Sequence, residues 1–191
     1  MTSDGSLISR SLAGDGEAFV EVVRRHSATV SAYLLRRAGR EAAEDLLGEV
    51  WVAAFGARSG YDPGVPDARP WLLGIARNVL RRHWRMRPHG EAALGTDEVA
   101  PPVDPWPAVD EWIDGAAIVR QALVRLSPGE REVLLLVVWE QLTVADAARA
   151  LAIPPGTARR RLHQARVTLR STPEIVALLN DCNECMVREV E

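Results

Sequence analysis

The segment TVADAARALAIPPGTARRRLHQARVTLR, residues 143–170, decides the architecture of the C-terminal half of the chain. It predicts a short alanine-rich helix at 143–151, a tight turn that contains Pro154, Pro155 and Gly156, and a second, basic helix. These are the sequence signs of a helix-turn-helix. Pro154 stands where a capping side chain is common, so we expect the second helix to begin without a side-chain cap.

The residues of this second helix fall on faces of different chemistry when they are placed at about 100° per residue. The apolar seam consists of Ala158, Leu162, Ala165 and Leu169. The opposite face consists of Arg160, His163, Gln164 and Val167, and one flank holds Arg159, Arg166 and Arg170. Arg161 lies alone on the other flank, where it is expected to serve the fold or a neighbouring helix.

The face opposite the seam is the one that a helix-turn-helix places in the major groove. We therefore expect Arg160, His163 and Gln164 to reach base edges. The flank residues Arg159 and Arg166 are better placed for phosphates, which position a helix without reading sequence. The alternative is a solvated basic face on a purely structural helix.

Charge is distributed in segments along the chain. The 191 residues carry a formal net charge of −3, and all 23 basic residues are arginine. Residues 120–170 hold nine arginines and four acidic residues, whereas residues 96–119 hold six acidic residues and no arginine. A basic segment in an acidic chain suits a polyanionic partner.

Helical periodicity also dominates residues 1–87. The stretches GDGEAFVEVVRRHSATVSAYLLRRA (14–38) and EAAEDLLGEVWVAAF (41–55) repeat apolar residues at spacings of three and four. Asp15 is expected to cap the first of them. A turn-rich loop follows at 56–68, and Pro70 opens another helix at 71–87. Because no stretch alternates with period two, the fold class is expected to be all-α.

Composition then divides the chain into two small helical domains joined by an acidic, proline-rich linker. The domains are expected at 10–87 and 116–171, and Ser127 and Thr143 are expected to cap helices in the second. Residues 88–115 hold five prolines and the acidic cluster, which is typical of a flexible linker. A tail follows at 172–191, with one short helix expected at 174–179.

Two features outside the domains stay open. Trp106 and Trp112 in the linker either pack on a neighbouring domain or dock into a partner. Cys182 and Cys185 form a C-x-x-C pair, which is half of a zinc site, a redox pair or an incidental feature of the tail. A closed zinc site needs four ligands and the sequence has no second cysteine pair, so we predict no metal site and no cofactor.

The sequence does not resemble an enzyme or a membrane protein. It lacks G-x-x-x-x-G-K-[ST], H-E-x-x-H and G-x-S-x-G motifs. No apolar run approaches the ~18 residues of a membrane span, and the first residues lack the basic start and apolar centre of a signal peptide. We expect a non-enzymatic protein of the cytoplasm without membrane insertion.

The helix expected at 71–87 interleaves basic and aromatic residues. Trp71 begins it, Trp84 lies near its end, and its polar side consists of Arg77, Asn78, Arg81, Arg82 and Arg85. Such a surface suits a nucleic acid, because aromatic rings can stack on unpaired bases. The alternative is an ordinary amphipathic helix.

Three segments in this order resemble the sigma-70 family of bacterial transcription initiation factors. AEDLLGEVWVAAF (43–55) and WLLGIARNVLRRHWR (71–85) are similar to the promoter-opening domain of that family. LSPGEREVLLLVVWEQLTVADAARALAIPPGTARRRLHQARVTLR (126–170) is similar to its C-terminal promoter-binding domain. Two such domains with little else resemble the extracytoplasmic-function (ECF) group, and the resemblance covers about residues 10–171.

The resemblance implies two protein contacts, with core RNA polymerase as the partner. The β′ clamp helices would bind the helix that carries Glu44, Asp45, Leu46, Glu49 and Trp51. The β flap is the second polymerase contact that the family implies, and an anti-sigma factor is a further candidate partner. A plain core helix with solvated acidic residues is the alternative for the first surface.

The resemblance also implies two contacts with promoter DNA. The helix at 71–87 and the loop at 56–70 would melt and read the minus-ten element, with Asn78 and Arg82 near the non-template strand. Phosphates would be held by Arg77, Arg81 and Arg85. The minus-35 element would be read by Arg159, Arg160, His163 and Gln164, with Arg166 on a phosphate. Arg81-Arg82 stands where an aliphatic-Asp pair is common, so the minus-ten preference is expected to differ.

The function that follows is initiation of transcription by binding core polymerase, recognising minus-35 and minus-ten elements and nucleating strand separation. The alternatives are a stand-alone helix-turn-helix regulator, which usually dimerises to read two half-sites, and a helical adaptor that binds polymerase without reading DNA.

Overall fold

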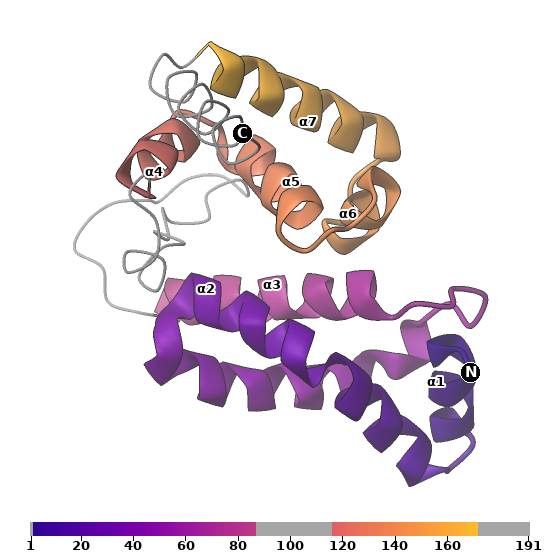
Figure 1. Cartoon of the computed structure of the whole chain (residues 1–191). Coiled ribbons are helices and arrows are strands. Elements are labelled where there is room, and N and C mark those ends of the chain that lie inside the picture. Colours follow the sequence, from indigo (N-terminus) through magenta and orange to yellow (C-terminus); the bar gives the residue numbers. More distant parts are fainter. Residues whose placement is uncertain (1, 87–115, 172–191) are drawn as a thin grey trace, which may run out of the picture.

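The computed structural model describes residues 2–86 and 116–171, and all regular structure in these ranges is helical (Figure 1). The N-terminal domain consists of α1 (Asp4–Leu12), α2 (Gly16–Ala57), the 3-10 turn η1 (Arg58–Gly60) and α3 (Arg69–Met86). The C-terminal domain consists of α4 (Ala116–Val124), α5 (Pro128–Val138), α6 (Val144–Ala150) and α7 (Pro155–Arg170). The predicted all-α class is confirmed. The linker and tail, with both linker tryptophans, the C-x-x-C pair and the helix expected at 174–179, lie outside the described residues.

Helix α2 contains both stretches that the sequence predicted as separate helices. Gly39, at φ 76° and ψ 172°, interrupts its helical backbone between them. The chain turns back at this point, so that the two halves of α2 lie side by side (Figure 1). A left-handed φ is readily adopted only by glycine, so Gly39 is the residue that permits the reversal.

Helix α1 begins before the expected start of the domain at residue 10. Ser3 caps it by accepting a hydrogen bond from the Ser6 amide. Its Leu7 and Ile8 are buried against the rest of the domain. Helix α1 is therefore an integral part of the N-terminal domain.

The apolar stripes predicted from spacing form the core of this domain. Asp15 caps α2 by accepting from the Ala18 amide, as expected. The buried apolar residues of α2 and α3 include Ala18, Phe19, Val22, Val30, Tyr33, Leu34, Ala43, Leu46, Val50, Ala54, Leu72, Leu73, Ala76, Val79 and Leu80. Helix α3 therefore packs along α2 through these residues, and its polar side faces away from α2.

Capping residues set the helix boundaries of the C-terminal domain. Ser127 and Glu130 form a reciprocal capping box at the start of α5, with Pro128 in the first turn. Thr143 accepts from the Asp146 amide at the start of α6. Helix α7 starts at Pro155 without a side-chain cap, as predicted from Pro154. These boundaries place α6 and α7 on either side of a short turn.

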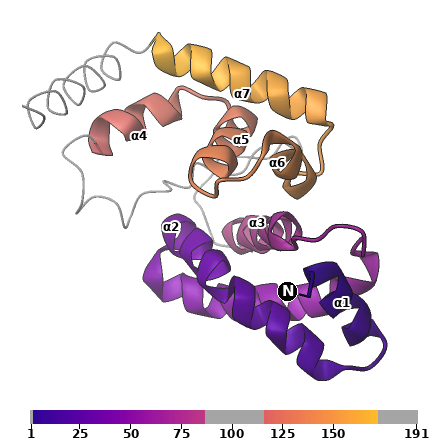
Figure 2. The same cartoon turned by 45° about the vertical axis from the view of Figure 1, so that its right-hand side comes forward.

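The C-terminal domain lies against α3 of the N-terminal domain in both views (Figures 1 and 2). Helices α3 and α6 pack closely because Gly74 has no side chain: a Cβ there would lie 2.8 Å from the carbonyl oxygen of Ala150. No helix of the described ranges is long and apolar enough to cross a membrane.

Candidate nucleic-acid interface

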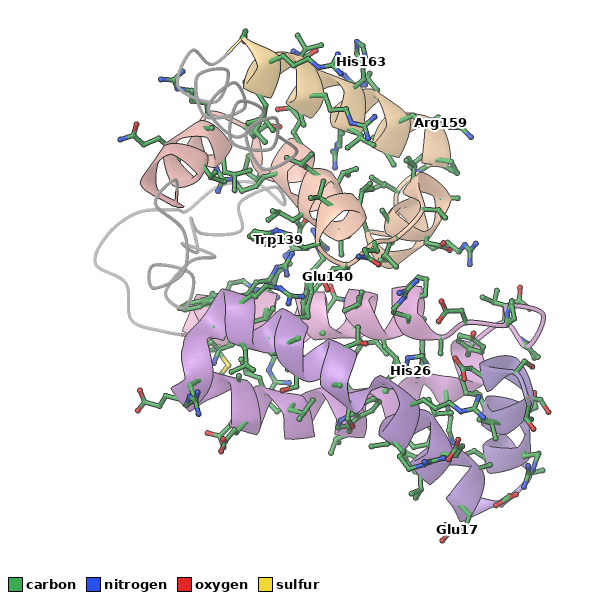
Figure 3. The ribbon with its side chains drawn as sticks, in the orientation of Figure 1. Glu17, His26, Trp139, Glu140, Arg159 and His163 are labelled. Atoms are coloured by element: carbon green, nitrogen blue, oxygen red, sulfur yellow. The ribbon has the colours of Figure 1, made fainter. Side chains whose placement is uncertain are left out.

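Helix α7 separates a buried seam from an exposed basic face. Ala158, Leu162 and Ala165 are buried, and Leu169 is partly buried against the same core. The five residues predicted for the minus-35 element are all exposed: Arg159, Arg160, His163, Gln164 and Arg166. Arg159 and His163 project from α7 to the outside of the molecule (Figure 3). The helix therefore presents hydrogen-bonding side chains over residues 159–166 opposite its core side, and the exposed Val167 follows them.

Arg161 differs from its two arginine neighbours. It is half-buried, and its guanidinium occupies the space beside Gly129 at the start of α5: a Cβ on Gly129 would lie 2.7 Å from Arg161 Nη1. The side chain thus packs across to another helix of the domain, in agreement with its isolated position on the helical wheel.

The predicted minus-ten residues of α3 occupy two environments. Asn78, Arg82 and Arg85 are exposed, and Arg81 is half-buried. Arg85 donates a hydrogen bond from Nε to the carbonyl oxygen of Arg81. Asn78, Arg82 and Arg85 are therefore exposed to solvent on the side of α3 away from its core contacts.

Arg77 instead faces the C-terminal domain. Its Nε donates to Glu132 Oε1 of α5 at 2.5 Å. Burial alone would lower the pKa of Arg77, but the hydrogen bond and the charge of Glu132 outweigh that effect and raise it. In this arrangement the guanidinium is committed to a carboxylate and is not presented to a phosphate.

A small cavity of about 160 Å³ opens at the loop before α3. It is lined by Gly60, Tyr61, Asp62, Val65, Asp67, Pro70, Trp71 and Arg149. The Tyr61 and Trp71 rings meet edge to face with centroids 5.1 Å apart. Burial, followed by the charges of Asp4 and Asp67, raises the pKa of Tyr61 to about 12. Since a cavity of roughly 150 Å³ accommodates a benzene ring, this space suits one planar ring.

The predicted polymerase surface on α2 combines acidic residues with apolar side chains. Glu44, Asp45 and Glu49 are exposed, and Trp51 is half-buried. Nearby, Val52 is 76% and Phe55 45% exposed, which the sequence prediction did not include. Val52 lies outside the apolar stripe of this half of α2, and an apolar residue off the stripe was the sequence signal for an exposed apolar side chain here.

Leu46 corrects the prediction for this surface. It is 1% exposed and belongs to the core of the domain. The family resemblance implied this surface for a run of neighbouring residues, and Leu46 lies in that run directly after the acidic Glu44 and Asp45. Leu46 cannot contact a partner without leaving the core.

Glu140 links the two domains through charges that sequence reasoning missed. It follows the apolar run of residues 133–139, and its side chain is 2% exposed. Arg36 Nη2 donates to both of its carboxylate oxygens at 2.8 and 2.7 Å, and Arg37 Nη1 lies 3.4 Å from Oε1. Trp139 and Glu140 lie at the boundary between the domains (Figure 3). A single acidic residue after a long apolar run was the signal for such a buried pair.

Family models match both domains. Residues 22–88 match the model "Sigma-70 region 2", and residues 116–169 match "Sigma-70, region 4". The linker separates the two matched segments, and α1 precedes both.

Two relatives extend the similarity over most of the chain. It is 33% identical over 171 residues to "ECF RNA polymerase sigma factor SigM" of Mycobacterium tuberculosis, covering 87% of this chain and 83% of that protein. It is 31% identical over 167 residues to "ECF RNA polymerase sigma factor BldN" of Streptomyces coelicolor, covering 85% of this chain. The aligned region spans only 63% of the length of that second relative.

Two solved structures share the fold. The structure of CnrH in complex with the cytosolic domain of CnrY matches with a TM-score of 0.61 at 24% identity, covering 93% of this chain and 97% of that one. The sigma factor RpoE in complex with the anti-sigma factor NepR from Bartonella quintana matches with a TM-score of 0.54 at 19% identity, covering 82% and 96%.

Proposed function

Because this chain belongs to the sigma-70 family, in its extracytoplasmic-function group, we propose that it directs core RNA polymerase to promoters with a minus-35 and a minus-ten element. The observation that carries the proposal is the pairing of two surfaces in one chain. Exposed hydrogen-bonding residues cover α7 opposite its buried seam, and a second basic surface follows α3 in the other domain.

Helix α7 reads the minus-35 element as duplex DNA. Arg160, His163 and Gln164 contact base edges in the major groove, because they lie opposite the seam that holds α7 to its domain. Arg159 and Arg166 lie beside this face and contact phosphates. Family precedent adds Arg159 to the base contacts, and its exposed position accommodates either role.

Helix α3 and the loop before it bind the melted minus-ten element. Asn78 and Arg82 lie near the non-template strand, and Arg81 and Arg85 hold its backbone. The cavity beside Tyr61 and Trp71 accepts one unstacked base. Flipping a base costs a few kcal/mol, which a fitted pocket can offset.

Promoter binding requires the C-terminal domain to move away from α3. Arg77 pairs with Glu132, and Arg149 of α6 lines the base cavity, so the docked arrangement occupies part of the minus-ten surface. In the separated state Arg77 is released to hold a phosphate. Polymerase binding supplies the free energy for separation by holding the two domains at different sites.

The polymerase contact of the N-terminal domain combines Glu44, Asp45 and Glu49 with Trp51 and the exposed Val52. Acidic and apolar groups on one helix suit docking to the β′ clamp helices, and the C-terminal domain binds the β flap. From this proposed partnership with the polymerase we infer a cytoplasmic location, and none of the proposed steps requires catalysis by this chain.

An anti-sigma factor is the proposed regulatory partner. The supporting observation is that both fold neighbours were solved with a bound partner, the cytosolic domain of CnrY in one case and the anti-sigma factor NepR in the other. A stand-alone helix-turn-helix regulator is not favoured, because such a protein needs no domain matching sigma-70 region 2.

In-vitro transcription with purified core polymerase on a genomic promoter library tests the proposal. The expected result is initiation from a defined set of promoters that core polymerase alone does not use. Binding of the folded chain to core polymerase without any promoter-specific initiation would instead support the adaptor function.

A further inference from the structure

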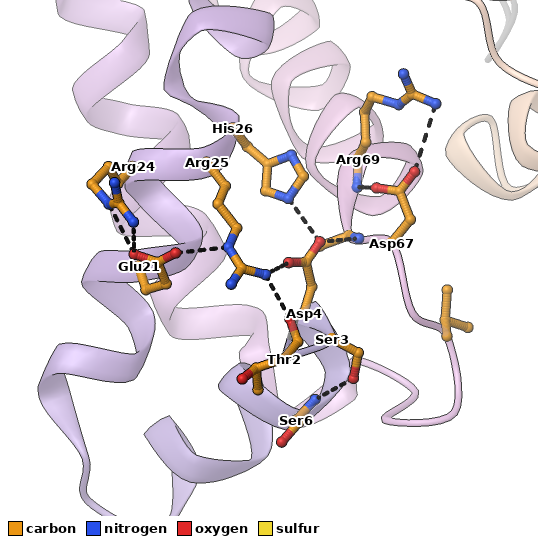
Figure 4. Close-up of polar contacts among 12 residues, drawn as sticks. Thr2, Ser3, Asp4, Ser6, Glu21, Arg24, Arg25, His26, Asp67 and Arg69 are labelled. Atoms are coloured by element: carbon orange, nitrogen blue, oxygen red, sulfur yellow. Dashed lines mark hydrogen bonds and ion pairs between the residues drawn. The ribbon is translucent and has the colours of Figure 1, made fainter.

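The first residues of α1 are bonded directly to the loop that precedes α3. The Asp4 amide donates to the carbonyl oxygen of Pro66 at 3.1 Å. The Asp4 side chain accepts a hydrogen bond from the Ala68 amide at 2.9 Å (Figure 4). One residue of α1 therefore binds the loop through both its main chain and its side chain.

Helix α2 holds the same carboxylate from the other side. His26 Nε2 lies 2.7 Å from Asp4 Oδ2, and Arg25 Nη1 donates to Oδ1 at 3.1 Å (Figure 4). Burial alone would raise the pKa of Asp4, but the Ala68 amide, His26 and Arg25 together lower it. The buried carboxylate thus joins α1, α2 and the loop in its charged form.

Gly5 lets α1 approach the loop more closely than any other residue would. A Cβ at this position would lie 2.2 Å from the carbonyl oxygen of Pro63 and 3.0 Å from that of Val65. Both obstacles are backbone atoms, so a larger residue would have to displace the loop itself.

These contacts reach the base cavity in one further step. The Val65 carbonyl that faces Gly5 also accepts a hydrogen bond from the Tyr61 hydroxyl at 2.8 Å. Tyr61 in turn meets Trp71 edge to face, and both rings line the cavity. A shift of the loop at Gly5 therefore changes the position of an aromatic wall of the cavity.

A metal ion is not needed to explain this cluster. Asp4, His26 and Asp67 offer three ligand atoms within 4.8 Å of one another. The oxygens of Asp4 already accept from a guanidinium and a backbone amide, and a cation beside Arg25 would be repelled. The cluster is satisfied as a hydrogen-bonded junction.

We propose that α1, through Asp4 and Gly5, is a positioning element that fixes the shape of the minus-ten reading loop and so sets its base preference. The inference rests on the proposed function, since it assumes that the loop reads that element. Helix α1 lies before the residues that match the region 2 family model, so this role belongs to a segment outside the matched domain.

The test compares Gly5→Ala with Gly16→Ala in holoenzyme with core polymerase. Gly16 also lies in the first turn of a helix, but a Cβ there meets no atom within 4 Å. Initiation is measured on promoters that carry every single-base change in the minus-ten element. Gly5→Ala is expected to reduce discrimination at the minus-ten element by about tenfold, the scale of one hydrogen bond to a charged group. Its minus-35 preference and its affinity for core polymerase are expected to stay within about twofold of wild type. For Gly16→Ala, the minus-ten discrimination, the minus-35 preference and the affinity for core polymerase are all expected to stay within about twofold of wild type.

Asp4→Asn provides a second variant and a measurement that needs no DNA. Hydrogen exchange at the Ala68 amide is expected to lose protection in this variant, while amides within α3 and α5 keep theirs. The inference is overturned if both variants keep the wild-type minus-ten preference. It is also overturned if initiation falls equally on all promoters while amides throughout the domain lose protection from exchange. A wild-type holoenzyme without any minus-ten preference would contradict the proposed function, whereas Ala68 exchange would still report whether α1 holds the loop.

Discussion

Arg36 of the N-terminal domain donates to the carboxylate of Glu140 in the C-terminal domain, with 2.7 Å between Nη2 and Oε2. The glutamate side chain is 2% exposed, whereas the arginine side chain is 29% exposed. Removing one partner of a buried pair leaves the other charge uncompensated. Because Arg36 and Glu140 belong to different domains, this contact acts directly on the docked arrangement.

Glu140→Gln is expected to shift the chain toward separated domains by roughly tenfold, because Arg36 and Arg37 lose their countercharge. The measurement is the radius of gyration from small-angle X-ray scattering, which should increase while circular dichroism keeps its helical signal. Glu17→Gln removes an exposed charge far from this contact and serves as the control. A scattering profile identical to wild type would show that Glu140 does not maintain docking.

Arg160 and Arg166 are expected to respond differently to substitution. Arg160→Ala should cost about 1–3 kcal/mol on the preferred minus-35 sequence and relax the preference at one base pair. Arg166→Ala should weaken binding evenly across sequences and reduce the slope of log affinity against log salt by about one. Holoenzyme titrations on variant promoters at several salt concentrations separate the two. Identical profiles for the two variants would contradict the assignment of base and phosphate contacts.

Arg161 is expected to act on stability, since its guanidinium packs beside Gly129. Arg161→Ala should lower the free energy of unfolding by about 1 kcal/mol through lost packing, with promoter preference unchanged. The exposed neighbour Arg159 is the matched control, because Arg159→Ala should change DNA binding and leave stability within about 0.5 kcal/mol. Urea unfolding measures the first effect. A larger loss of promoter preference for Arg161→Ala than for Arg159→Ala would refute this division.

Asp4 is expected to give stability that depends on pH. A carboxyl group whose pKa is lowered by folding stabilises the fold above its unfolded-state pKa and loses that contribution as the pH falls through the folded-state pKa. For Asp4 the loss begins near its ordinary value of 3.8 and extends below it. The difference in unfolding free energy between wild type and Asp4→Asn should therefore be larger at about pH 7 than at about pH 3. Asp45→Asn, which changes an exposed carboxyl group, is the control. The prediction is contradicted if the difference in unfolding free energy between wild type and Asp4→Asn is larger at about pH 3 than at about pH 7.

Local patterns were sufficient to predict the helices and the faces of α7. Ala158, Leu162 and Ala165 are buried, as their helical spacing predicted. The capping residues Asp15, Ser127 and Thr143 each accept a hydrogen bond from the backbone amide three residues later in the chain. These features depend on neighbours within one or two turns of helix, which the sequence displays directly. Helix α1 was missed because its nine residues contain few apolar side chains to mark a stripe.

Contacts between distant segments could not be predicted in the same way. Arg77 and Arg82 look alike in the sequence, but only Arg77 meets Glu132, because the C-terminal domain docks on that side of α3. The bond from Ala68 to Asp4 spans 64 residues and depends on how α1 packs across α2. Leu46 was included in the polymerase surface because the family resemblance implied it, and a match of position does not show which side chains of a helix its own domain covers.

Reading of two promoter elements by two separate domains of one chain is the basis of the proposed function. It is tested most directly by initiation from one promoter in three forms, namely intact, altered in the minus-35 element and altered in the minus-ten element, with wild-type and Arg160→Ala holoenzymes. We expect wild type to lose initiation on both altered forms. Arg160→Ala should lose less initiation than wild type when the minus-35 element is altered, because it no longer discriminates at one base pair of that element, and it should remain fully sensitive to the minus-ten change. If Arg160→Ala kept full sensitivity to the minus-35 change, or lost sensitivity to both elements together, the two domains would not read the two elements separately.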